Sequence, residues 1–596
     1  MSSHKRIVII GAGYGGVHAA KLLNKKFKND STVEITLIDK KPYHTLLTDL
    51  HEVAGSRIEP DSVRVYLHKI FANKKVKVIT DEVEKIDYEK QSVIGKDGEY
   101  NYDYLILGIG SEPCDFGIPG VFEYGFTVGT LEAAIKTREH IEEMFRKASV
   151  ESNAEKKRKM LTFVVAGAGF TGIETAGELM EWTKSLCDKY HLDRNDVKIM
   201  VVEALNTILP NLNARLAAKA QKFLNRKGVE VLTNAPIVEV AKDYIVLKDE
   251  RKIETKTLIW TCGVQGNKCV ENFGLELGRR CRVQTNEYMQ AVGKENIYVI
   301  GDLAYYELDG KPIPQVVETA LQSAETAVHN IVADIKGEEK KPFKPRYHGF
   351  MVSIGSRYAV AELMGVSLTG FLAMAMKHLV NMHYLFGVAG VDAVLSYIYH
   401  EFFEVKSNRS ILGGHIAAHI PIFWLVLLRI YVGALWLIEG INKIQQGWLD
   451  PSKIFIITTS DVSGATAKAG EAATAAQALQ PLLKEPPAFY KWFMDTFVAP
   501  HAFLFQAMVV LAEVAIGLAL IAGLFTALAS AGSIFLALNF ILSAMADKSI
   551  LWYIFSAIAL MGGAGRAFGL DYYVIPWIKN WWKKTSFARR TYLYVS

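Results

Sequence analysis

Two stretches in the first half of the chain repeat one pattern of apolar and polar positions. Each begins with a short apolar run, at residues 6–10 and 161–165, that is typical of a buried strand. A glycine-rich turn and a helical pattern follow, and then a second apolar run, at residues 35–38 and 199–202, that ends at an acidic residue. Strands alternating with helices in this way predict parallel sheets covered by helices, so we expect two α/β units.

The pattern changes near residue 410, after which charged residues become rare. Four long apolar stretches follow, at residues 422–438, 503–525, 527–546 and 550–563. Because roughly 20 apolar residues are needed to cross a bilayer as a helix, we expect four membrane helices, of which the last is short. A soluble buried bundle is the alternative, and it suits such long uncharged stretches poorly.

Basic residues near the C-terminus predict an orientation. They are Lys579, Lys583, Lys584, Arg589 and Arg590. Basic segments tend to stay on the cytoplasmic side, and four crossings return the chain to the side where it began. We therefore expect a prokaryotic cytoplasmic membrane with the first half of the chain on the cytoplasmic side. The segment 445–500 then lies outside, as a partly helical, amphipathic or loosely ordered insert.

Each glycine-rich turn has the spacing of a dinucleotide-binding fingerprint. The first glycine allows a tight bend, the second lets the backbone approach a pyrophosphate at the helix N-terminus, and the third lets helix and strand pack closely. The acid that closes the next strand accepts hydrogen bonds from ribose hydroxyls and repels a 2′-phosphate. The sequence thus predicts two dinucleotide sites, at Gly11, Gly13, Gly16 and Asp39, and at Gly167, Gly169, Gly172 and Glu203.

Composition narrows the remaining choices. A net charge of +5 over 596 residues gives no indication of a nucleic-acid partner. The five cysteines include no Cys-x-x-Cys pair, so we expect a reducing compartment, no disulfide framework and no metal site. The N-terminus leads almost directly into the first apolar run, and no signal peptide is expected.

Later segments of the first half resemble a known class of enzymes. Residues 102–111, 257–264 and 296–302 are similar to segments of the flavoprotein reductases with two dinucleotide-binding domains, in which a nicotinamide domain is inserted into a split FAD domain. In that class the Gly-Asp pair of the last segment, here Gly301 and Asp302, holds the flavin ribitol and pyrophosphate. The resemblance implies FAD-binding halves at 1–120 and 270–335 with an NADH-binding domain at 121–269.

Within this class the chain resembles the type II NADH dehydrogenases, which are single-chain, non-pumping NADH:quinone oxidoreductases. Residues 43–55 look like the segment under the flavin, and Gly172-Ile173-Glu174-Thr175-Ala176-Gly177-Glu178-Leu179 looks like the helix start whose first glutamate faces the nicotinamide. This likeness covers about residues 5–400. It implies FAD as cofactor, NADH as substrate and Glu174 as the group that orients the nicotinamide. The other cofactor-binding residues that it implies are Lys40, Thr48, Val83, Gly110 and Gly263.

The acceptor side departs from the family pattern at one position. The family has two glutamines on the helix after the flavin aspartate, whereas this chain has Glu318 first and then Gln322. We expect quinone near Glu318, Gln322 and Gly355, with Glu318 as a proton carrier if it is buried. The glutamate could instead mark a related reductase with another acceptor.

The region 336–405 is expected to seat the protein on the membrane. Its residues 374–400 resemble the amphipathic membrane-seating segment of the family. We expect Lys377 near the mouth of the quinone site, although Lys377 and His383 suit interfacial anchors equally well.

Residues 428–433, 440–443 and 565–571, together with Glu513 and Gly517, are similar to segments of the DoxX-like small membrane proteins. This resemblance covers the remaining residues, 410–596. Five of them share one helix face because they are spaced by three or four: Arg429, Gly433, Trp436, Gly440 and Lys443. Small residues on such a face permit close helix contact, and a charge within a bilayer is costly unless it is paired. We expect Arg429 to pair with Glu513, either as a structural ion pair or as part of a quinone or proton site.

The expected fold class is thus an α/β two-dinucleotide-binding-domain flavoprotein with an added all-α four-helix membrane domain. The expected function is electron transfer from NADH to a membrane quinone, with the lipid bilayer and a homodimer as further partners. A sulfide:quinone oxidoreductase is an alternative, for which Cys262 and Cys269 are the only close cysteine pair. A flavoprotein sensor attached to a transporter or anchor is another.

Overall fold

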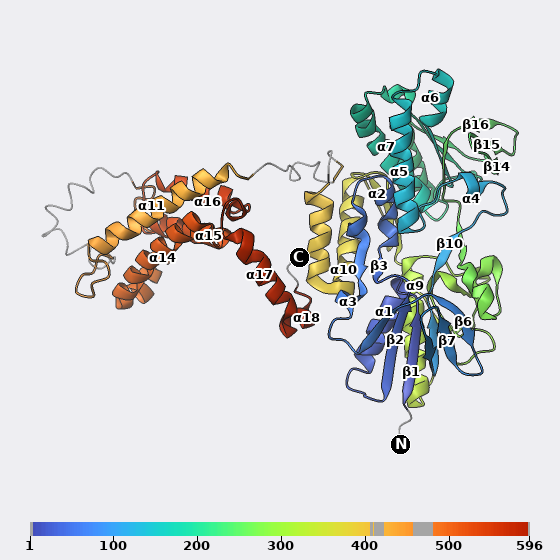
Figure 1. Ribbon diagram of the computed structural model, residues 1–596, viewed down its shortest axis with the longest axis horizontal. Helices are drawn as coiled ribbons and strands as arrows, with labels where there is room; N and C mark the ends of the chain where they lie inside the picture. The colour runs from blue at the N-terminus through green and yellow to red at the C-terminus, as the bar shows by residue number, and fades with distance from the viewer. Residues whose placement is uncertain (1–3, 406–408, 411–421, 457–480, 594–596) are drawn as a thin grey trace. The chain divides into compact units, whose positions relative to one another are not determined.

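The computed structural model in Figure 1 describes residues 4–405, 409–410, 422–456 and 481–593. The chain divides into two compact units, one with residues 1–418 and 586–594 and the other with residues 419–585. Within the described residues, every strand belongs to the first unit, whereas the second unit is helical.

A five-stranded parallel sheet carries the first glycine turn, with strand order β20-β9-β1-β2-β5. Its strands are β1 Lys5–Ile10, β2 Val33–Asp39, β5 Val76–Thr80, β9 Tyr104–Leu107 and β20 Ile297–Val299. Helices α1 (Tyr14–Lys26) and α9 (Val317–Lys336) pack on one face of this sheet. Strand β20 pairs with β9 although the whole second sheet separates them in sequence, so a late segment completes the first sheet.

The second glycine turn lies in a four-stranded parallel sheet, with strand order β13-β12-β11-β17. Its strands are β11 Thr162–Ala166, β12 Lys198–Val202, β13 Val229–Leu232 and β17 Thr257–Trp260. The helices of this part are α5 Leu131–Ala148, α7 Phe170–Tyr190 and α8 Ala214–Arg226. Every residue of β11 is buried, which explains why its sequence is continuously apolar rather than alternating.

Short strands join and cover the two parallel sheets. Strand β10 (Ser111–Pro113) pairs with β18 (Val264–Gly266), and the Trp260 indole donates to the carbonyl oxygen of Cys114 at 2.8 Å. Two antiparallel sheets consist of β6 Val83–Asp87, β7 Ser92–Gly95 and β8 Glu99–Asn101, and of β14 Ile237–Val240, β15 Tyr244–Leu247 and β16 Lys252–Glu254. Other short elements are β3 Tyr43–Thr45, α2 Leu50–Ala54, β4 Arg64–Tyr66, α3 Leu67–Ile70, α4 Val121–Tyr124, α6 Ala154–Met160, β19 Val283–Gln284, β21 Ala304–Tyr305, β22 Glu307–Leu308 and β23 Lys311–Pro312.

An antiparallel sheet and a long helix end the first unit. The sheet contains β24 Gly349–Ser353, β25 Ala359–Leu363 and β26 Val366–Thr369. Helix α10 (Phe371–Ile398) follows, and it is kinked where Gly390 adopts φ +71°. Its exposed apolar side chains include Phe371, Leu379 and Phe386, as expected of a helix that contacts lipid.

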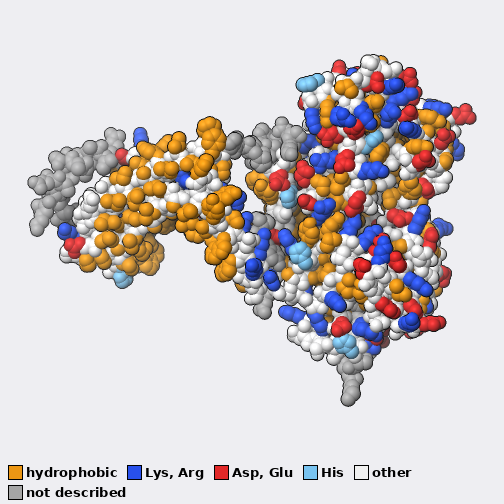
Figure 2. Space-filling view, viewed as in Figure 1, with side chains coloured by type: hydrophobic (Ala, Val, Ile, Leu, Met, Phe, Trp, Pro, Cys, Tyr) orange, Lys and Arg blue, Asp and Glu red, His pale blue; other side chains and the backbone are white. Residues whose placement is uncertain are grey.

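Each of the four apolar stretches forms a helix in the second unit. They are α11 Leu425–Gln445, α14 Ala502–Ala522, α15 Thr526–Leu542 and α16 Ile550–Leu560, with α13 Ala488–Phe493 before α14 and α17 Asp571–Lys584 after α16. Figure 2 shows apolar side chains covering much of the visible face of this unit. Helix α16 has 11 residues, about 16 Å at 1.5 Å per residue, and is short for a bilayer core.

The expected fold class is confirmed by these elements. Among the described residues, the helical segments Phe371–Phe403, Leu425–Gln445 and Ala488–Ala522 are long and apolar enough to cross a membrane, and Thr526–Leu542 and Ile550–Leu560 are shorter apolar helices. Residues 457–480 of the expected insert lie outside the described residues. The predicted domain limits stay a prediction.

Candidate functional site

The first glycine turn joins β1 to α1. Gly11 adopts φ +99°, and a Cβ atom there would lie 2.4 Å from the carbonyl oxygen of Gly108. A Cβ atom at Gly16 would lie 1.8 Å from the carbonyl oxygen of Gly11, but the nearest described atom to one at Gly13 would be 3.9 Å away. The first and third glycines are therefore required by packing, whereas the second borders open space at the N-terminus of α1.

The second turn, between β11 and α7, repeats this arrangement. Gly167 adopts φ +94°, and a Cβ atom at Gly172 would lie 1.9 Å from its carbonyl oxygen. A Cβ atom at Gly169 would have no described atom within 4 Å. Since packing does not require Gly169, the open space beside it is where a pyrophosphate can approach the helix N-terminus.

Each predicted acid holds its own turn. Asp39 Oδ2 accepts the N–H of Ala12 at 2.6 Å, and Glu203 Oε2 accepts the N–H of Ala168 at 2.6 Å. Burial raises the pKa of Asp39 above its ordinary value. Each carboxylate thus lies at its own glycine turn, where the ribose of a dinucleotide would lie in this fold.

The Gly-Asp pair lies at the end of β20. The Gly301 N–H donates to Ser323 Oγ at 2.9 Å, and the Ser111 hydroxyl donates to Asp302 Oδ2 at 2.7 Å. Burial raises the pKa of Asp302. These contacts connect the late segment to α9 and to the start of β10.

Two helix N-termini meet beside this pair. A Cβ atom at Gly15 in α1 would lie 3.0 Å from the carbonyl oxygen of Ala320 in α9, and one at Gly301 would lie 3.3 Å from the Ala320 Cβ. Because a helix N-terminus carries partial positive charge, this convergence favours an anionic group such as a pyrophosphate.

The other expected cofactor-binding residues lie in the same unit. Lys40 is exposed directly after Asp39, and Val83 begins β6. The hydroxyl of Thr48 lies 3.1 Å from that of Tyr14, the first residue of α1. Gly110 adopts φ +73° in open space, and Gly263 adopts φ +151°.

Glu318 and Gln322, which the sequence suggested for the acceptor side, hold the segment before β24 through hydrogen bonds. Glu318 Oε1 lies 2.7 Å from His348 Nδ1, and its other oxygen accepts the His348 N–H at 3.1 Å. Gln322 exchanges two hydrogen bonds of 2.8 Å with the backbone of Arg346. Glu318 is half-buried rather than buried, so its environment differs from the apolar site that the sequence suggested.

Glu174 and Gly355 lie at the contact between α7 and the sheet of β24. The backbone N–H and the hydroxyl of Ser353 each donate to Glu174 Oε1 at 3.3 Å, and His51 Nδ1 lies 3.6 Å from Glu174 Oε2. Burial raises the pKa of Glu174 to about 8 and lowers that of His51 to about 3. Gly355 adopts φ +73°, and a Cβ atom there would lie 2.4 Å from Glu181 Oε1.

A buried network of ion pairs next to Glu174 was missed by sequence reasoning. Arg57 contacts Glu52 and Glu401 and lies 3.0 Å from Glu178, and Arg409 lies 2.6 Å from Glu178. Burial alone would raise the pKa of Glu52, but Arg57 and Lys377 hold it well below its ordinary value. The network comprises Glu52, Arg57, Glu178, Lys377, Glu401 and Arg409. The available signal was Lys377, a charge that interrupts the apolar run at the start of α10.

Lys377 belongs to this network. It contacts Glu52 and is 6% exposed, so the alternative of an interfacial anchor is wrong for this residue. His383 is exposed.

The expected ion pair between Arg429 and Glu513 is also wrong. Arg429 donates to the carbonyl oxygens of Ala564 and Phe568, at 2.9 and 3.2 Å, and Glu513 contacts Lys443 instead. The turn after α16 offers carbonyl groups without helical partners, and these satisfy the guanidinium. The structure therefore gives no support to a quinone or proton site built on an Arg429–Glu513 pair.

The expected small-residue face of α11 packs on α14. A Cβ atom at Gly433 would lie 2.9 Å from the carbonyl oxygen of Gly517, and one at Gly440 would lie 2.7 Å from a Val514 methyl. Glycine therefore permits the close approach of these two helices.

Comparison with known proteins gives two family matches. Residues 5–327 match the family described as pyridine nucleotide-disulphide oxidoreductase, and residues 476–595 match the TQO small subunit DoxD. The second match agrees with the expected DoxX-like domain.

Individual proteins cover most of the first unit. The chain is 34% identical over 392 residues to the type II NADH:quinone oxidoreductase of Staphylococcus haemolyticus, which is 65% of this chain and 96% of that protein. A structure of NDH2 from Plasmodium falciparum in complex with NADH covers 70% of this chain and 100% of its own, with 18% identity and a TM-score of 0.61. A structure of the sulfide:quinone oxidoreductase of Aquifex aeolicus covers 70% of this chain and 96% of its own, with 18% identity and a TM-score of 0.54.

Proposed function

The chain belongs to the type II NADH:quinone oxidoreductase family, and on that premise we propose that its first glycine turn holds FAD and its second holds NADH. Like its family, it passes electrons from NADH to quinone. The observation that supports the two-site assignment is the pair of matched turns, each with a crowded first and third glycine and an open second one.

The residues present fit an FAD. The open space beside Gly13, the convergence of α1 and α9 at Ala320, and the buried Asp302 together provide helix N-termini for a pyrophosphate and a carboxylate for ribitol hydroxyls. An FAD held by these residues would supply two-electron transfer between the nicotinamide and the quinone. The proposed domain limits are 1–120, 121–269, 270–335, 336–405 and 410–596.

Glu174 orients the nicotinamide in this proposal. With a pKa of about 8, its carboxyl group is mostly protonated at neutral pH, so it can donate a hydrogen bond to the carboxamide oxygen of the substrate. Ser353 holds the other oxygen of the carboxyl group, and the pKa of about 3 keeps His51 neutral. The role is positional, because no proton moves from Glu174 during hydride transfer.

Protons for the quinone come from the acceptor side. The pair formed by Glu318 and His348 is accessible to water, so it can take up a proton and present it at the quinone. Gln322 fixes the backbone of Arg346 and thereby the position of His348. Gly355 and Lys377 also belong to the quinone side in this proposal. Lys377 contacts the buried Glu52 and does not line an open entrance.

The chain is membrane-associated, and we place the catalytic unit on the cytoplasmic side of a prokaryotic membrane. If α11, α14, α15 and α16 each cross the membrane, the even number of crossings and the basic residues after α16 support this orientation. The exposed apolar side chains of α10 provide a second contact with lipid. Homodimer formation remains a prediction that size measurement of the detergent-solubilised protein can test.

We expect the chain to prefer NADH over NADPH because the Glu203 carboxylate would repel a 2′-phosphate. Replacing it, in Glu203→Gln, should reduce the NADH/NADPH ratio of kcat/KM by about tenfold or more, which equals at least ~1.4 kcal/mol. Steady-state oxidation of each cofactor with a soluble quinone measures the ratio.

Glu239→Gln is the matched control, because Glu239 is an exposed glutamate in strand β14. It should keep the native ratio. Equal use of both cofactors by the native chain would contradict the role given to Glu203.

We expect Glu318→Gln to leave reduction by NADH close to the native rate and to slow the reaction with quinone about tenfold or more, because an amide cannot carry the proton. Stopped-flow absorbance separates the two half-reactions. The control is Glu325→Gln, since Glu325 also lies on α9 and pairs with a histidine, His18, at 3.1 Å. A slower reaction with NADH and an unchanged one with quinone would place Glu318 on the nicotinamide side.

The two alternative functions have less support. The likeness to a sulfide:quinone oxidoreductase is one of fold, at 18% identity. Steady-state NADH oxidation by the purified full chain, with menaquinone and ubiquinone analogues, tests the sensor alternative, which expects negligible turnover with both.

A further inference from the structure

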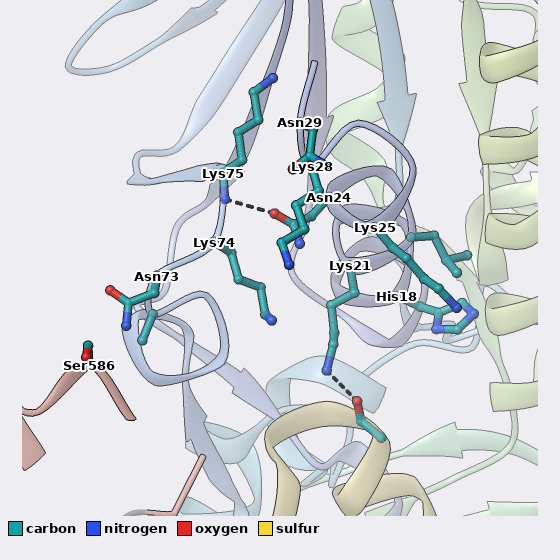
Figure 3. Close-up of a pocket in the computed structure, with 13 residues that line it drawn as sticks. His18, Lys21, Asn24, Lys25, Lys28, Asn29, Asn73, Lys74, Lys75 and Ser586 are labelled. Atoms are coloured by element: carbon teal, nitrogen blue, oxygen red, sulfur yellow. Dashed lines mark hydrogen bonds between the residues drawn. The ribbon is translucent and has the colours of Figure 1, made fainter. Parts of the chain in front are cut away.

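A cavity of about 970 Å³ lies beside α1, and its described lining residues include no glycine of either glycine turn. Its lysines come from two segments: Lys21, Lys25 and Lys28 from α1 and its C-terminal end, and Lys74 and Lys75 from the loop before β5. Figure 3 shows the Lys74 amine extending toward that of Lys21 across this space. Two independent segments therefore bring like charges together.

Positive charge is in excess in the lining of this cavity. Among the described residues that line it, none carries a carboxylate. Lys21 donates to the carbonyl oxygens of Gly387 and Val388, the latter at 2.7 Å, and Lys75 donates to the carbonyl oxygen of Asp30. Burial, and then the nearby charge of Lys74, lower the pKa of Lys21 to about 8. An anion in the cavity would offset this repulsion.

The membrane-seating helix α10 forms part of the cavity wall, through Gly387. The adjacent Phe386 is 60% exposed, and Val391 and Leu395 on the same helix are also exposed. Exposed apolar side chains thus lie on the same helix that contributes Gly387 to the wall of the basic cavity. An amphiphile with an anionic head and apolar chains matches this sequence of surfaces, whereas a soluble anion uses only the lysines.

The C-terminal segment adds an aromatic side chain. Tyr592 donates to the carbonyl oxygen of Ile70 at 2.8 Å, and its ring centre lies 4.8 Å from Lys74 Nζ and 5.6 Å from Lys21 Nζ. Tyrosine is enriched where proteins meet the headgroup layer of a bilayer. The position of this ring is therefore consistent with a cavity at that level.

We propose that this cavity binds the phosphate headgroup of an anionic phospholipid, whose acyl chains lie along the exposed apolar side chains of α10. The residues that line this cavity are not among those proposed to bind NADH or quinone. Lysines serve here as point charges for a phosphate, as in other basic pockets at membrane surfaces.

The test compares the full chain with the variant Lys25→Gln/Lys28→Gln/Lys74→Gln, which keeps Lys21 and Lys75 because they bind backbone carbonyl groups. Native mass spectrometry in neutral detergent counts bound phosphatidylglycerol and phosphatidylcholine of equal chain length. We expect the occupancy of phosphatidylglycerol to fall roughly tenfold or more in the variant. Phosphatidylcholine occupancy and NADH oxidation with a soluble quinone should stay unchanged.

A control variant carries Lys219→Gln, Lys222→Gln and Lys248→Gln, which remove the same charge from exposed lysines elsewhere. It should bind phosphatidylglycerol like the native chain. Equal phosphatidylglycerol occupancy in all three proteins would overturn the proposal. Binding of inorganic pyrophosphate is measured in the same three proteins. If the cavity variant loses pyrophosphate binding but still binds phosphatidylglycerol, the ligand is a soluble anion and the proposal is also overturned.

Discussion

Replacing Arg57 with methionine is expected to destabilise the first unit by about 3–5 kcal/mol, because it leaves buried carboxylates without their cation. Arg57 is 4% exposed and contacts Glu52, Glu178 and Glu401. Thermal unfolding of the full chain, followed by release of flavin fluorescence, measures the change. Loss of soluble protein would be the extreme form of the same result.

The matched control is Arg64→Met. Arg64 pairs at 2.5 Å with the exposed Asp61, and such surface pairs contribute about 0–1 kcal/mol. Equal midpoints for Arg57→Met and Arg64→Met would show that the buried network does not support the fold.

The deficit of Arg57→Met should grow as the pH rises. Burial already raises the pKa of Glu178 in the native chain, and loss of Arg57 raises it further. A carboxyl group with a raised pKa in the folded state destabilises that state progressively above its ordinary pKa, near 4.3. The variant should therefore be closest to the native midpoint under mildly acidic conditions.

A second large effect is expected when alanine replaces individual glycines of the second glycine turn, which we propose holds NADH. Gly169→Ala should raise the KM for NADH about tenfold or more, or at least ~1.4 kcal/mol, because its methyl group occupies the space that the pyrophosphate needs. Stability should change little, since Gly169 has φ −72° and its Cβ atom would meet no described atom. Steady-state kinetics and thermal unfolding of the same preparation separate these effects.

Gly172→Ala should show the opposite balance. Its Cβ atom would lie 1.9 Å from the carbonyl oxygen of Gly167, so the turn must shift. The free energy of unfolding should fall by about 1–3 kcal/mol. A native KM for NADH in Gly169→Ala would show that no pyrophosphate lies at the second glycine.

The strands and turns could be predicted because they depend on neighbouring residues. The apolar run predicted at residues 161–165 is strand β11, which begins one residue later and is buried at every position. The glycine spacing after it specifies a turn that few other residues permit. The length of the apolar runs likewise predicted helices α11, α14, α15 and α16 of the second unit. Such features need no knowledge of which distant segment packs against them.

The sequence itself determined the two α/β units, both glycine turns with Asp39 and Glu203, the apolar helices and the glycine face of α11. Only the tertiary structure decided which charges meet. Arg429 donates hydrogen bonds to backbone carbonyl groups and Glu513 contacts Lys443, although the sequence had suggested that Arg429 and Glu513 pair with each other. Arg57 joined Glu52, Glu178 and Glu401 from three separate segments. A local pattern reports that a charge interrupts an apolar run, but its partner depends on the packing of remote elements, because a buried ion is stable only where desolvation is offset by a group at contact distance.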